Sequence, residues 1–165
     1  MLKKWWGVFM ALALFMGGSK AADGFMLYAS SKSFLFYGVG AAYKTGSLRF
    51  NLGASTFYFL PGGLQAGAAF LVPLGDQQSG GGSLYAAGGM EADLYLIYGV
   101  GFVSLYPYGA LGLAWGNGSS LEMRLGYAFL AAASQGQSAS APLGFTLGFA
   151  YTTPLPSFLP SPPIR

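Results

Sequence analysis

Residues 106–129 read YPYGALGLAWGNGSSLEMRLGYAF, a pattern of two β-strands joined at Asn117-Gly118. An Asn-Gly pair between two alternating segments is the strongest short-range signal of a β-hairpin. In the second segment, large apolar side chains alternate with small or charged ones. The large side chains are those of Leu121, Met123, Leu125, Tyr127 and Phe129. The opposite face carries Glu122 and Arg124 among small residues. This period of two predicts strands with one face that avoids water.

The same alternation recurs along most of the chain. It is clearest in residues 33–44, 47–60, 84–98 and 143–151. A short first strand is expected at residues 25–29, although residues 25–44 also read as one kinked strand. Strands with an apolar face towards lipid and a polar face towards a lumen are typical of membrane β-barrels, in which closed single chains have an even number of strands. We therefore predict an all-β fold for residues 22–153, an antiparallel transmembrane β-barrel of about eight strands.

Charged residues test this assignment of faces. Five of them fall on the small-residue face of three segments: Arg49, Glu91, Asp93, Glu122 and Arg124. A basic side chain that faces lipid at mid-bilayer costs about 2–4 kcal/mol, and an acidic one somewhat less. We therefore predict a lumen charge cluster in which the acids pair with Arg49 and Arg124. The alternative is that several of these residues lie near strand ends, in the headgroup zone, where the cost falls towards zero.

The two ends of the chain differ from the middle. Lys3 and Lys4 precede the apolar residues 8–16, and Ser19-Lys20-Ala21 has the small-x-small form of a cleavage site. This order predicts a secretory signal peptide over residues 1–21, and an uncleaved membrane anchor is the alternative. Residues 154–165 are rich in proline, which favours an extended tail. A polyproline ligand for a partner is a second interpretation of that tail.

Charge and composition restrict the function. Three of the eight Lys and Arg residues lie in residues 1–21, so five remain against five Asp and Glu, and residues 22–165 carry no net charge. The basic balance of the whole chain therefore does not indicate a nucleic-acid partner. Only 8% of residues are charged, whereas a soluble domain has about 25%. Lipid or other subunits are expected to cover most of the outside.

Residue types that often carry catalysis or hold a cofactor are missing from this sequence. The chain has no His and no Cys, so a His-dependent triad is excluded and no thiolate site exists. Glu91 and Asp93 are two residues apart, as paired carboxylates are, but no metal-ligand spacing accompanies them. We expect no catalytic residue, no metal and no cofactor. Four aromatic residues are expected either in interfacial girdles or in ordinary strand packing. They are Tyr106, Tyr108, Trp115 and Tyr127.

The chain resembles the small outer-membrane β-barrel proteins of diderm (Gram-negative-type) bacteria. The likeness rests on the signal peptide, on the Pro-Tyr strand at residues 106–113 and on the closing strand at residues 144–151. It implies a location in the outer membrane and contact with membrane lipid and the outer-membrane insertion machinery. In that family an aromatic residue usually ends the chain, whereas here Tyr151 is followed by the Pro-rich tail.

Four functions remain open on the sequence. The leading one is a structural or surface-interaction protein of the outer membrane. The second is a passive pore or carrier for small or apolar solutes. The third is a Gly-rich helical membrane protein, because residues 94–121 carry no charge and are long enough to span a bilayer. The fourth is a secreted Gly-rich β protein that self-assembles.

Overall fold

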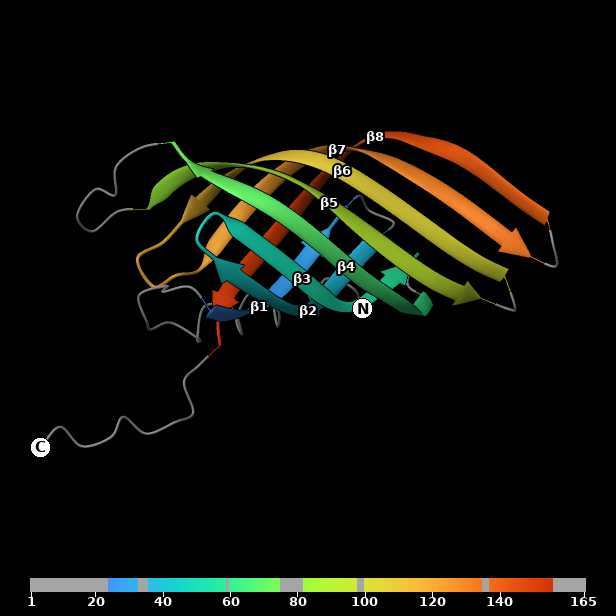
Figure 1. Ribbon diagram of the computed structural model, residues 1–165, viewed down its shortest axis with the longest axis horizontal. Helices are drawn as coiled ribbons and strands as arrows, with labels where there is room; N and C mark the ends of the chain where they lie inside the picture. Colours follow the sequence, from blue (N-terminus) through green and yellow to red (C-terminus); the bar gives the residue numbers. More distant parts are fainter. Residues whose placement is uncertain are drawn as a thin grey trace, which may run out of the picture.

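Eight antiparallel strands, each paired with its neighbours in sequence order, close into a barrel where β1 meets β8 (Figure 1). The computed structural model describes residues 24–32, 36–58, 60–74, 82–97, 100–134 and 137–155. The strands are β1 (Gly24–Ser31), β2 (Phe36–Thr45), β3 (Leu48–Phe57), β4 (Leu60–Pro73), β5 (Ser83–Ile97), β6 (Val100–Ala114), β7 (Ser120–Ser134) and β8 (Gln137–Pro154). The predicted eight-stranded antiparallel barrel is confirmed. The signal peptide and nearly all of the Pro-rich tail lie outside the described residues.

The helical interpretation of residues 94–121 is wrong. These residues form the end of β5, all of β6 and the start of β7. Pro107 has no N–H and would break a helix, whereas the alternation of side chains fits a strand with two faces. Within the described part of the chain, no helix is long and apolar enough to cross a membrane.

The β6–β7 hairpin turns over residues 116–118, with Gly116 and Asn117 at the centre of the turn and Gly118 after them. The Gly118 N–H donates to the Trp115 carbonyl over 2.8 Å, and the Asn117 Oδ1 accepts the Ser119 N–H over 2.9 Å. Gly118 has φ +84°, a left-handed conformation that glycine adopts without steric cost. Ladder pairing resumes at Ala114 and Ser120, so the alternating faces of β6 and β7 are fixed relative to each other.

Large apolar side chains face outwards around the barrel. Leu52 on β3, Leu125 on β7 and Phe145 on β8 are 67%, 60% and 79% exposed. Their chain neighbours of opposite parity point inwards, because successive side chains of a strand lie on opposite faces. The barrel therefore has an apolar exterior and gathers its polar side chains inside.

Glycine allows the sheet to close tightly between β2 and β3. Gly40 and Gly53 are directly paired. A Cβ atom at Gly53 would lie 2.2 Å from the Val39 carbonyl oxygen, and one at Gly40 would lie 2.2 Å from the Leu52 carbonyl oxygen. Backbone atoms cannot move aside as a flexible side chain does, so both positions require glycine.

The strands differ in length, and this makes the barrel asymmetric. β1 has 8 residues and β8 has 18. β1 pairs with β8 only from Ser31↔Phe149 to Met26↔Pro154, so residues 137–148 of β8 pair with β7 alone. The ends of β5 to β8 project beyond the shorter strands on the right of Figure 1. A β-bulge near Leu143 and Gly144, where Gly144 has φ +93°, bends the projecting part of β8.

Substitution of the paired glycines tests the tight closure. Gly53→Ala is expected to lower the free energy of unfolding by about 1–3 kcal/mol, because the added methyl overlaps a backbone carbonyl. Gly88→Ala is the matched control, since a Cβ atom there meets nothing within 4 Å. It is expected to be neutral or to stabilise by about 0.4–1 kcal/mol. Denaturant unfolding in detergent micelles measures both, and equal midpoints would contradict the close approach.

Candidate functional site

The interior of the barrel holds a cluster of charged side chains from four places in the fold. All five charged residues singled out from the sequence lie there: Arg49 on β3, Glu91 and Asp93 on β5, and Glu122 and Arg124 on β7. Each is at most 1% exposed. The structure therefore places them in the lumen and not at strand ends in contact with solvent.

Glu122 binds two guanidinium groups. Arg49 donates to both of its carboxylate oxygens, from Nη1 to Oε1 over 2.6 Å and from Nη2 to Oε2 over 2.9 Å. Arg124 donates from Nε and Nη2 to Oε2 over 2.9 and 2.7 Å. The Tyr85 hydroxyl adds a bond to Oε1 over 3.0 Å. Two-point contacts of this kind fix the orientation of both groups as well as their separation.

Arg124 continues the network to Glu91. Its Nη1 donates to Glu91 Oε1 and to the Tyr28 hydroxyl, both over 2.7 Å. The Tyr28 hydroxyl in turn donates to Glu91 Oε1. The Gln65 Nε2 donates to Glu91 Oε2 over 2.9 Å and to the Ser30 Oγ over 3.0 Å. Side chains of β1, β4, β5 and β7 therefore meet around one carboxylate.

Lys32 completes the charge cluster, although its place in the sequence did not predict a position in the lumen. Its Nζ lies 2.5 Å from each Asp93 carboxylate oxygen and 3.4 Å from Glu91 Oε2. Asp93 was expected to pair with an arginine, and this expectation is wrong. Asp93 lies two residues beyond Glu91 on β5, which brings it level with the end of β1. Met26, Tyr28 and Ser30 are buried, and Lys32 is the next residue in the same alternation. This alternation could have predicted that Lys32 points into the lumen.

The charged layer has an aromatic cluster on one side along the barrel and buried hydroxyl groups of β7 and β8 on the other. At one end the rings of Phe36, Phe57 and Tyr95 pack together, with centroids 5.1, 6.2 and 6.0 Å apart. At the other end the buried hydroxyl groups form two pairs. These are Ser119–Thr153 over 3.0 Å and Ser120–Thr152 over 2.7 Å. Between these layers three basic side chains face three acidic ones, so the cluster has no net charge.

Two of the four aromatic residues expected at the interface lie inside the barrel, which corrects that expectation. Tyr106 and Tyr108 are 0% and 6% exposed, and their rings stack with centroids 5.6 Å apart. The Arg124 guanidinium lies 4.3 Å from the Tyr108 ring centroid. The reason is the alternation of side chains along β6. Both tyrosines lie on the same inward face as Ser104, whereas Leu105 points outwards.

The other two expected aromatic residues remain accessible from outside. Trp115 lies in the β6–β7 connection at the barrel end and is 38% exposed. Tyr127 lies on the outer face of β7, where its ring meets the Phe145 ring edge-on at a centroid distance of 5.1 Å. Trp115 therefore lies at one end of the barrel, and Tyr127 lies at the middle of β7.

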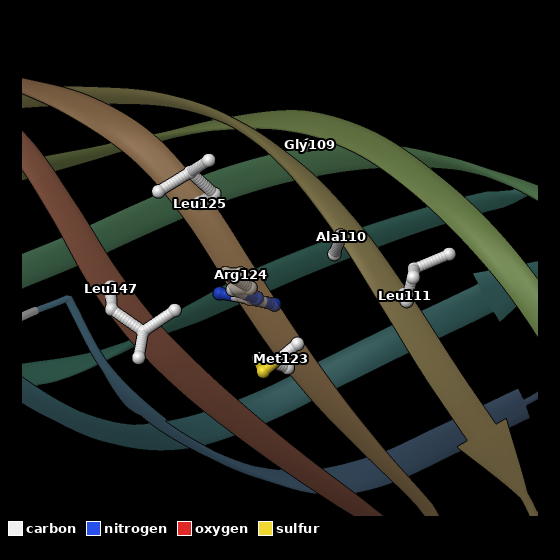
Figure 2. Close-up of a pocket in the computed structure, with 7 residues that line it drawn as sticks. All are labelled: Gly109, Ala110, Leu111, Met123, Arg124, Leu125 and Leu147. Carbon is white, nitrogen blue, oxygen red and sulfur yellow. The ribbon is translucent and has the colours of Figure 1, made fainter.

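The outer wall is hollowed between β6, β7 and β8 (Figure 2). This hollow of about 330 Å³ has Gly109 in its floor and Leu111, Met123, Leu125 and Leu147 around it. Arg124 contributes to the wall but its charged group is buried in the lumen. The lining is mainly apolar. Among the described residues no group of three or more acids, His or Cys is placed to hold a metal ion.

The fold and its interior define a class of protein, an eight-stranded antiparallel β-barrel with an apolar exterior and an ion-paired lumen. Comparisons with protein-family models, with curated proteins and with solved structures find no match for this chain. The assignment of a function therefore depends on the geometry itself.

Removal of Glu122 tests the importance of the charge network for stability. Glu122→Ala leaves the Arg49 and Arg124 guanidinium groups buried without their shared carboxylate, and loss of one partner from a buried pair costs about 3–5 kcal/mol. The double variant Arg49→Met, Glu122→Met is expected to recover part of this loss, because one unpaired charge is removed as well. Unchanged unfolding midpoints for Glu122→Ala and Arg124→Ala would contradict the pairing.

A double-mutant cycle tests the Lys32–Asp93 contact. Lys32→Met and Asp93→Asn are each expected to destabilise the barrel, and the double variant is expected to lose less than their sum, with a coupling of about 0.5–3 kcal/mol. The control cycle combines Asp93→Asn with Lys44→Met. Lys44 pairs with Gly24, at the far end of β1 from Lys32, so that cycle is expected to be additive within about 0.5 kcal/mol.

Proposed function

We propose that this chain is a small outer-membrane β-barrel protein with a structural or surface-interaction role and without catalytic activity. The observation that carries the proposal is the contrast between its two faces. The six buried charges pair with one another inside the barrel, whereas large apolar side chains cover the outside.

The exterior supports contact with membrane lipid. Exposed Leu, Phe, Val and Met side chains recur on every strand, and contiguous apolar surface of this extent is rare on soluble monomers. The ten residues of β2 and of β3 match the 9–11 residues that a tilted transmembrane strand needs. In the closed part of the barrel each strand has a neighbour on both sides, so backbone hydrogen bonds are satisfied between strands, as lipid requires. If the chain is an outer-membrane barrel, as proposed, we expect the outer-membrane insertion machinery to deliver it to the membrane.

The interior argues against the passive pore. A solute path would have to separate Arg124 from Glu91 and Glu122, which it holds with three short hydrogen bonds. The six charged side chains are at most 2% exposed. Side chains can fill the interior of an eight-stranded barrel, and this burial supports a filled lumen over a passive pore.

The interior also argues against catalysis. Glu91, Asp93 and Glu122 each lie against a guanidinium or ammonium group. A carboxylate so engaged is not free to accept a proton from a substrate, and no substrate reaches it. The surfaces left for function are the ends of the barrel and the projecting part of β5 to β8.

Three measurements on the chain refolded in detergent micelles test this proposal. We expect a faster gel mobility before boiling than after it, as a closed barrel gives, and incorporation into liposomes. We also expect no current steps in planar bilayers, because the lumen is filled. Discrete conductance steps would favour the passive pore instead. Failure to enter liposomes would contradict the membrane location.

A further inference from the structure

The projecting part of β8 has an unpaired edge. Residues 137–148 pair with β7 on one side, and β1 pairs with β8 only from residue 149 onwards. No other described strand reaches that edge. Its outward side chains are exposed, and Phe145, at 79%, has the highest exposure among the large hydrophobic residues described.

This edge has no charged side chain to prevent strand pairing. Natural edge strands are protected by charged side chains, by proline or by bulges. Residues 137–148 contain no charged residue. Pro142 and the bulge at residues 143–144 interrupt the edge, and Gly148 lies against the backbone of Ser31 and Lys32. Residues 145–147 remain as a run without charge, proline or bulge. Open sheet edges do not occur in the hydrocarbon of a membrane, because each unpaired backbone group there costs several kcal/mol.

We propose that this edge binds an extended segment of a partner protein as an added β-strand, antiparallel to β8 and in line with β1. Main-chain hydrogen bonds supply affinity in this mode, and alternate side chains supply specificity. The outward neighbours Leu143, Phe145 and Leu147 fit large apolar side chains on the incoming strand.

The inner face of the same edge fits small side chains. The Tyr106 hydroxyl donates to the Thr146 carbonyl over 3.2 Å, so its ring occupies the space beneath the edge. A Cβ atom at Gly148 would lie 2.3 Å from the Ser31 carbonyl oxygen, so little space remains where β1 ends. The Thr146 hydroxyl is buried without a hydrogen-bond partner among the described residues. A Ser or Thr opposite it would satisfy that group, as hydroxyl pairs across strands do.

A second copy of the chain does not fit this edge, a step that rests on the proposed membrane location. Two copies inserted in the same orientation have β8 strands that cross the membrane in the same sense, so their edges cannot form an antiparallel ladder. The segment at residues 156–165 fits poorly as well, because four of its residues are proline and have no N–H. The occupant is therefore an uncharged strand of another protein, with large apolar residues outwards and small residues inwards.

A capped, fluorescent peptide of residues 125–131 (LGYAFLA) serves as the probe. It has the required alternation, and the same sequence already pairs antiparallel with β8 on its other edge. We expect saturable binding to the full chain folded in detergent, measured by fluorescence anisotropy. A peptide with alternate backbone nitrogens methylated loses ladder donors and is expected to bind at least tenfold more weakly.

Two lysine variants identify the edge. Phe145→Lys adds a charge at the unpaired edge and is expected to weaken peptide binding at least tenfold. Leu52→Lys is the matched control, because Leu52 is 67% exposed on the same apolar exterior but paired on both sides, with Ala41 and Ala66. It is expected to change binding less than twofold.

Equal binding by both variants, or no saturable binding, would overturn strand addition. A dimer that Phe145→Lys abolishes, measured by analytical ultracentrifugation, would assign the edge to a second copy instead. The heat-dependent gel shift of the barrel does not depend on this edge, so it separates failure of this proposal from failure of the proposed membrane location.

Discussion

The position of Arg124 between Glu91 and Glu122 is the interaction on which the interior depends. This guanidinium bridges carboxylates from β5 and β7 and lies over the Tyr108 ring of β6. Through Glu122 it is linked to Arg49 on β3, and through Tyr28 to β1. Buried charges are tolerated only when they are paired and hydrogen-bonded. The network therefore couples strands that share no ladder.

That coupling compensates for the shortest strand. The ladder between β1 and β8 is the shortest in the barrel. Three inward side chains, two on β1 and one just after it, are nevertheless held by contacts across the lumen. Tyr28 bonds to Glu91 and Arg124, Ser30 accepts from Gln65, and Lys32 meets Asp93 just past the strand end. Closure of the barrel thus rests on side-chain contacts across the lumen as well as on backbone pairing between β1 and β8.

The same shortness of β1 gives the molecule its asymmetry. A strand that stops at Ser31 cannot cover β8 beyond Phe149, and the rest of β8 extends with β5, β6 and β7 as an open sheet. The closed part has a filled lumen and an apolar wall suited to lipid. The open part presents backbone groups and exposed side chains.

The sequence by itself determined the strands, their two faces and the burial of the charges. These are local properties, because a period of two assigns each side chain to a face and a charge on the apolar face is too costly. Only the tertiary structure decided that Lys32 pairs with Asp93, that Tyr106 and Tyr108 fill the lumen and that β8 has an unpaired edge. Each of these depends on the register between strands distant in sequence, and alternation along one strand does not specify which residues of another strand lie opposite.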